Sequence, residues 1–380
     1  MGLVVSGYGP LLEHLTRRFG VSLPVAGSTI SVQFAGALAG VLLAMRAFER
    51  LAARVTVTAS CAIAALGLTG VATAFTWPLF LGSVFVFGLG FGGLDLGLNQ
   101  VVAYSSGRRR AALLNALNSA YPAGAVIGPV LVAALAAAHF AALFLLVAAA
   151  FLVVAPGILR ISGRLPVAAE PDRRPGGLVV VFVVAFVLYV AVEVGTGGWM
   201  TSHLESTGLA SGNAATLTSA FWLALVTGRL LITLVPAKVG EATIVLAASA
   251  AATVTLGLAS IGAVAPIAYV AAGLAMAPIF PTGIVWLAKM QPGDSRATAW
   301  LYPAASVGGV VGPGAIGIVI AQAGVGWAPA VLAVVAAAMY GAFMAASRRW
   351  RTSCAAGCRD VPRAGRWGAR RRRTTPPRWR

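Results

Sequence analysis

The feature that most constrains this chain is a series of apolar stretches, each about as long as the hydrocarbon core of a bilayer is thick. A helix needs about 20 apolar residues to cross a core of ~30 Å. Hydrophobic residues make up 59% of the 380 residues and charged residues 10%, whereas soluble domains carry about 25% charged residues. The sequence therefore predicts an all-α polytopic membrane protein and excludes a water-soluble enzyme.

Ahead of the full spans, residues 1–12 (MGLVVSGYGPLL) are apolar over about half a span and lead to Glu13. They lack the charged region and the small-residue cleavage site of a signal peptide. We interpret them as the outer end of a first helix whose beginning is missing, which gives twelve helices in all. The other eleven spans are Val25–Met45, Val55–Phe75, Pro78–Ala103, Ala111–Ala138, Phe140–Leu159, Leu178–Ser202, Ala214–Val235, Ala242–Ile261, Pro266–Ala288, Ala297–Ala321 and Trp327–Ala346.

The basic residues predict an orientation. The formal charge is +18, but 12 of the 28 Lys and Arg residues lie between Arg348 and Arg380, and most others cluster in alternate loops. Cytoplasmic loops of membrane proteins are rich in Lys and Arg. This placement favours a topology signal over nucleic-acid binding. It predicts a multi-pass protein of the plasma or bacterial inner membrane with a cytoplasmic C-terminus.

Two similar halves follow one another along the chain. STISVQFAGALAG (28–40) aligns without gaps to TLTSAFWLALVTG (216–228), and Tyr-Pro followed by Gly-Pro occurs in both 118–131 and 300–316. The first alignment pairs Ser31 with Ser219 and Gly40 with Gly228. Two parallel six-helix halves, with a site between them near the midplane, are a known transporter plan.

The composition also predicts where the halves begin and end. A Pro/Gly-rich, charged segment separates them, and such segments connect domains. We expect an N-terminal bundle at 1–159, a cytoplasmic linker at 160–177, a C-terminal bundle at 178–347 and a disordered basic tail at 348–380.

Two carboxylates, Asp95 and Glu193, lie well inside predicted spans, whereas the other eight acidic residues fall in loops, at span edges or in the tail. A charge at a helix centre costs about 2.5–3.5 kcal/mol, so such residues are functional by default. A carboxyl group that is charged in water and neutral when water is excluded can carry a proton. We predict that Glu193 carries the proton and that Asp95 is its partner or a gate. The alternative is that each carboxyl only holds the bundle together.

The chain resembles the major facilitator superfamily along its whole length. GLGFGGLDLGLNQ (88–100) resembles the Gly-rich fourth helix of the fucose/galactose–proton symporter group, and YVAVEVGTGGWMTSHL (189–204) resembles its seventh helix. The resemblance implies a monomeric secondary transporter that takes up a sugar-like or other small polar solute with protons by alternating access. It implies no enzymatic activity, no metal and no cofactor.

Polar and aromatic side chains on the spans are the candidate ligands of the solute. Sites for small molecules place a few polar groups in apolar walls, and aromatic rings stack on sugar faces. The candidates are Gln33, Asn99, Asn118, Tyr121, Tyr189, Trp222, Trp300 and Tyr302. An interfacial aromatic belt is the alternative for Trp300.

A further set of residues is predicted to serve gating and helix packing. Small residues four apart permit close helix approach, and proline removes a backbone hydrogen bond. These residues are Gly124, Gly128, Pro129, Gly312, Pro313, Arg50, Arg54, Gly228 and Arg229. The Gly-Pro motif also resembles one found in drug–proton antiporters, so proton-driven efflux of a drug or secondary metabolite remains the alternative function.

Overall fold

The computed structural model describes residues 1–103, 110–158, 176–232, 238–291, 297 and 300–357. This part of the chain is built of helices joined by short turns, and ten helical segments are long and apolar enough to cross a membrane. The predicted all-α membrane fold is confirmed. The helices of the first half are α1 (Gly2–Phe19), α2 (Leu23–Arg50), α3 (Ala53–Thr73), α4 (Trp77–Ala103) and α5 (Arg110–Ile158).

The second half begins after the predicted linker, most of which lies outside the described residues, as does the tail from residue 358. Its helices are α6 (Gly177–Ser206), α7 (Ser211–Leu231), α8 (Glu241–Leu258), α9 (Ala265–Met276), α10 (Ile279–Met290), α12 (Leu301–Ala323) and α13 (Ala328–Gly357), with a short 3-10 turn at Val325–Trp327. The last helix runs beyond Ala346, where the predicted span ends.

Two of the crossings differ from single uninterrupted helices. α5 has 49 residues, about 74 Å at 1.5 Å per residue, which is too long for one crossing. His139 breaks its helical geometry with φ −133° and ψ 36°, close to the predicted boundary between two spans. α9 and α10 together form one span, interrupted next to Pro278, which lacks a backbone donor.

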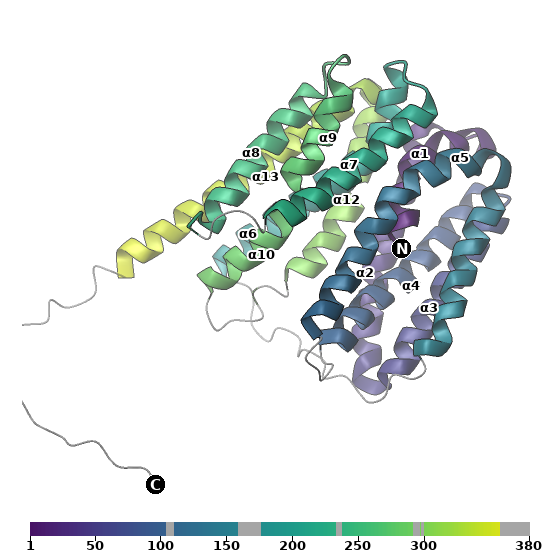
Figure 1. The fold of residues 1–380 in the computed structure, drawn as a ribbon, viewed down its shortest axis with the longest axis horizontal. Coiled ribbons are helices and arrows are strands. Elements are labelled where there is room, and N and C mark those ends of the chain that lie inside the picture. Colours follow the sequence, from purple (N-terminus) through teal and green to yellow (C-terminus); the bar gives the residue numbers. More distant parts are fainter. Residues whose placement is uncertain (104–109, 159–175, 233–237, 292–296, 298–299, 358–380) are drawn as a thin grey trace, which may run out of the picture.

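The helices form two bundles that lie side by side, α1–α5 and α6–α13 (Figure 1). The main contacts between them join α2 to α12, α5 to α7 and α1 to α6. These pairs occupy equivalent positions in the two halves, since the segments that align in the sequence lie on α2 and α7 and on α5 and α12. The observed architecture is therefore the predicted pair of pseudo-symmetric bundles.

The two ends of this assembly differ in charge. We call one the basic end, where α2 ends at Arg50, α10 carries Lys289 and α13 carries Arg349. At the opposite end, three glycines adopt positive φ in the turns that follow α1, α6 and α12, a conformation that costs glycine little. These glycines are Gly20, Gly208 and Gly324.

Glycines permit a close crossing of α2 and α4 in the first half. A Cβ atom at Gly92 on α4 would fall on the backbone carbonyl of Ala37 on α2, and Gly40 lies equally close to the Leu89 carbonyl. Gly228, the repeat partner of Gly40, packs against Leu274 on α9. Small residues are common where membrane helices approach closely. The crossing of α7 and α9 in the second bundle is thus equivalent to the crossing of α2 and α4 in the first, with a glycine at the same position in each.

The crossing of α2 and α4 predicts opposite effects for two alanine substitutions on one helix. Gly92→Ala should lower the free energy of unfolding by about 1–3 kcal/mol, because the added methyl group has no space. Gly82→Ala should leave it unchanged or raise it slightly, since nothing lies within 4 Å of that position and alanine favours helix. Thermal unfolding of the two purified variants measures the difference; equal midpoints would contradict the packing.

Candidate functional site

An ion pair joins the two helices that begin the second bundle. The Arg229 Nη2 atom on α7 lies 3.2 Å from the Glu193 Oε1 atom on α6 and donates a hydrogen bond to it. Glu193 lies near the middle of α6 and Arg229 in the last turn of α7, and 32% of the Arg229 side chain and 13% of the Glu193 side chain remain accessible. Neither charge is stable alone within a membrane-spanning helix. The pairing of these two residues did not follow from the sequence.

Two tyrosines stand next to the ion pair. Tyr189 lies one turn before Glu193 on α6, is fully buried, and its hydroxyl group faces both charged side chains. Tyr121 on α5 comes from the other bundle and interacts electrostatically with Glu193 and Arg229. The site is therefore shared between the two halves.

Asp95 on α4 extends the site on the side of the first bundle. Its charge acts on Tyr121, and its Oδ1 atom accepts a hydrogen bond of 3.3 Å from the Asn99 side chain one turn along the helix. The residue is exposed although the bundle surrounds it. The Asp95 carboxyl group is therefore accessible from outside the bundle.

The opposite end of the molecule is closed around α6. Every residue from Val194 to Leu204 is buried, on all sides of the helix. The Trp199 ring packs against Gly27 on α2 and Gly317 on α12, and its Nε1 atom donates a hydrogen bond of 3.1 Å to the Pro313 carbonyl. Gly9 on α1 meets the Gly197 carbonyl. Asp95, Glu193 and Arg229 therefore lie on the side of this closed segment that faces the basic end.

Eight of the buried polar atoms without a hydrogen-bond partner in the described part of the chain lie on α2, α6 and α7 and are relevant to this site, while others lie on α1, α3 and α4. Buried polar groups normally have a partner, so these atoms are available to water or a solute. They are Oγ of Ser31 and Ser219, both amide atoms of Gln33, Oγ1 of Thr196, Oη of Tyr189, Nε1 of Trp222 and Nε of Arg229.

Three of these side chains were absent from all the predicted site residues. Ser31 on α2 lies beside Gly314 of α12, at the contact between the bundles, and Ser219 occupies the equivalent position on α7. Thr196 lies one turn beyond Glu193. The gap-free alignment of the two halves pairs the two serines, and that pairing was the signal that could have found them.

The other predicted ligands are distributed unevenly. Trp222 packs against Gly197, which lies one helical turn beyond Glu193 on α6, away from the basic end. Trp300 lies at the start of α12, at the basic end. Arg50 and Arg54 are exposed at the basic end, away from the ion pair. The side chains of Asn118 and Tyr302 lie outside the described part of the structure.

The predicted glycine–proline motifs lie on contacts between helices. Gly124 and Gly128 on α5 pack against Leu3 of α1, and Gly312 on α12 packs against Ala191 of α6. Pro129 and Pro313 follow inside the same helices. Each motif thus joins corresponding helices of its own bundle.

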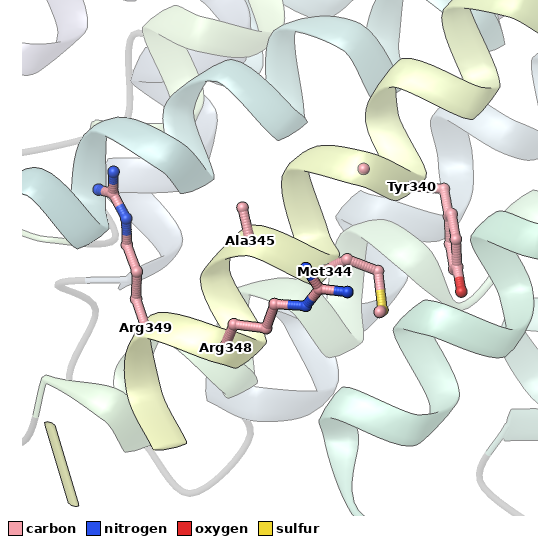
Figure 2. Close-up of a pocket in the computed structure, with 6 residues that line it drawn as sticks. Tyr340, Met344, Ala345, Arg348 and Arg349 are labelled. Atoms are coloured by element: carbon pink, nitrogen blue, oxygen red, sulfur yellow. The ribbon is translucent and has the colours of Figure 1, made fainter. Parts of the chain in front are cut away.

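Two hollows lie elsewhere on the molecule. One of about 530 Å³ is lined by α13 residues near the basic end, including Tyr340, Met344 and Arg348 (Figure 2). The other, of about 350 Å³, is lined by apolar residues of α7 and α9 and by Pro266. Neither hollow is lined by a charged residue of the site, so we assign no solute to them.

The ion pair should behave as a unit when it is disrupted. Arg229→Gln leaves the Glu193 charge without its partner, so we expect a loss of about 1–3 kcal/mol of stability, between the values for exposed and buried pairs. Glu193→Gln combined with Arg229→Gln should recover most of this loss. Lys289→Gln, which breaks an exposed pair with Glu241, is the control. Chemical unfolding in micelles measures the stability of the three variants. Equal losses of stability in Arg229→Gln and Lys289→Gln would contradict burial of the Glu193–Arg229 pair.

Known proteins share this sequence pattern and this fold. The family model of the Major Facilitator Superfamily matches residues 1–271 of the sequence. No curated protein matches the sequence significantly. Similar solved structures include the nucleoside transporter NupG (15% identity, 91% of this chain and 96% of that one, TM-score 0.70), a D-xylose–proton symporter (14%, 90% and 94%, 0.70) and the E. coli fucose:proton symporter FucP (16%, 91% and 96%, 0.61). Both the predicted superfamily and its twelve-helix fold are confirmed. The chain belongs to the Major Facilitator Superfamily and is a multi-pass membrane transporter of small solutes.

Proposed function

We propose that the chain is a proton-coupled symporter of a small polar solute, and that Glu193 carries the proton. The observation that supports this most is the ion pair of Glu193 and Arg229, which joins two membrane-spanning helices and is partly accessible. The pair has no net charge, so the empty carrier can change conformation without moving a charge through the membrane. A proton that binds Glu193 cancels its charge and leaves Arg229 as a single cation, which the low-dielectric interior disfavours.

This imbalance provides the coupling. A carrier that holds a proton but no solute cannot readily change conformation, because Arg229 is then an unpaired buried charge, which is strongly destabilising. Solute that interacts with Arg229 relieves the imbalance and allows the loaded carrier to change conformation. Proton and solute therefore move together. Asp95 lies on the open side of the site and serves in this proposal as the residue through which the proton enters or leaves.

We also propose the orientation and cellular setting. The basic end faces the cytoplasm, by the distribution of Lys and Arg in membrane proteins, so the conformation described is open to the cytoplasm and closed to the outside. The protein acts as a monomer in the plasma or inner membrane. Residues 160–177 connect the two bundles on the cytoplasmic side, where the C-terminus also lies.

Transport by reconstituted protein tests the coupling. L-Fucose, D-xylose and uridine are suitable first probes, because the similar structures include transporters of fucose, xylose and nucleosides. Carboxylated sugars are tested beside these neutral probes, and we expect an imposed pH gradient to drive accumulation of at least one of the solutes by the wild-type protein. Glu193→Gln should abolish gradient-driven accumulation and retain exchange of labelled for unlabelled solute, because exchange requires no net proton movement. Asp95→Asn should slow accumulation about tenfold or more.

A matched control is Glu241→Gln, which removes an acidic side chain from the exposed pair at the basic end. This variant should accumulate solute like the wild type. If Glu193→Gln still accumulates solute against its gradient, the assignment of the proton to Glu193 is wrong. Accumulation that requires the opposite direction of the pH gradient would show antiport and export instead.

A further inference from the structure

We infer that the solute is a small hydroxylated monocarboxylate, whose carboxylate group takes the place of Glu193 as the partner of Arg229. The inference rests on the proposed function, since it concerns the same site and the same proton. It narrows the solute from any small polar molecule to an organic anion with one negative charge. The reasons lie in the surroundings of Arg229.

The first reason is the balance of charge around Arg229. Within the described ranges, Glu193 is the carboxylate that acts on the guanidinium group, and the other groups that act on it are the hydroxyls of Tyr189 and Tyr121. Once Glu193 takes a proton, Arg229 faces two neutral hydroxyls. A neutral sugar would leave this charge uncompensated, whereas a carboxylate would neutralise it.

The second reason is the supply of hydrogen-bond donors. Arg229 uses its Nη2 atom for Glu193, while its buried Nε atom has no partner among the described residues. A guanidinium group presents its N–H donors as a planar fork that fits a carboxylate with two parallel hydrogen bonds. A carboxylate therefore matches the geometry that Arg229 already presents.

The third reason concerns the rest of the solute. Trp222 lies two turns before Arg229 on α7, so both side chains are on one face of that helix. Its Nε1 atom is buried without a partner in the described structure, as are both amide atoms of Gln33. These groups suit hydroxyl substituents beyond the carboxylate. Arg229 is one cation, so a solute with two negative charges would exceed its capacity.

The charge on the solute determines how much net charge crosses the membrane in each transport cycle. One proton binds Glu193 and one monoanion binds Arg229, so the loaded carrier carries the same net charge as the empty one. Transport of the pair therefore moves no net charge across the membrane. A neutral solute with one proton would move one positive charge per cycle.

Binding to matched pairs of probes tests the inference. The full-length protein in lipid nanodiscs is exposed to D-gluconate and D-glucuronate, and to their neutral counterparts D-glucitol and D-glucose, and the thermal midpoint and the dissociation constant are measured from pH 5 to 8. We expect a carboxylate to bind the wild type at least tenfold more tightly than its neutral counterpart. Its affinity should fall up to tenfold per pH unit once Glu193 is deprotonated, because binding takes up one proton.

Two variants separate this role from a structural one. Glu193→Gln leaves Arg229 permanently available, so it should bind the carboxylate at least as tightly as the wild type does at low pH, with no dependence on pH. Combined Glu193→Gln and Arg229→Gln should lose the preference for the carboxylate. The double variant removes both charges, so it leaves no buried charge to disturb folding, and its thermal midpoint without solute reports on its integrity.

Several results would overturn the inference. These are equal or tighter binding of the neutral counterparts, no binding of either carboxylate, or carboxylate binding that survives in the double variant. If neutral solutes bind and a pH gradient drives their accumulation, the proposed symport holds and the anionic substrate does not. If a carboxylate binds through Arg229 but no pH gradient drives its accumulation, the anion site holds and the symport does not.

Discussion

The desolvation of charge inside the membrane is the constraint on which this structure depends. Arg229 and Glu193 lie where an isolated charge is strongly disfavoured, and each compensates the other across α6 and α7 at 3.2 Å. A pair of this kind is a poor source of stability, because hydrophobic residues could replace it at little or no loss. Its value to a transporter is that one proton changes its net charge. The conformational cycle can then depend on whether that change is compensated.

The surrounding fold leaves this pair partly accessible while closing the other end. The fully buried segment of α6 from Val194 to Leu204 seals one side through Trp199, which packs on α2 and α12. Glycine contacts such as Gly92 with Ala37 and Gly228 with Leu274 hold the helices of each bundle close together. Rigid bundles of this kind can rock against each other around a site shared between them. Ser31, one of the polar residues without a partner in the described structure, lies at the contact between α2 and α12.

The sequence predicted the architecture well because span length and repetition are strong signals. Every predicted span has a helical counterpart, and the break at His139 falls between two of them. Glu193, Tyr189, Tyr121 and Asp95 could be nominated from the rarity of polar groups inside spans, and the structure brings them to one region. The ion pair was not predictable, because 36 residues separate Glu193 from Arg229 and the relative rotation of two helices is set by packing. Ser31, Ser219 and Thr196 were missed because small hydroxyl residues also occur in apolar helices for packing.

Infrared difference spectroscopy of the reconstituted protein across a pH titration tests the central claim most directly, because it detects the proton on a carboxyl group without any solute. The account predicts a protonated-carboxyl band that grows as the pH falls, is absent from Glu193→Gln and moves to higher pH in the Arg229→Gln variant, where the stabilising cation is gone. A titration that is identical in the wild type and in Glu193→Gln would contradict the assignment of the transported proton to Glu193.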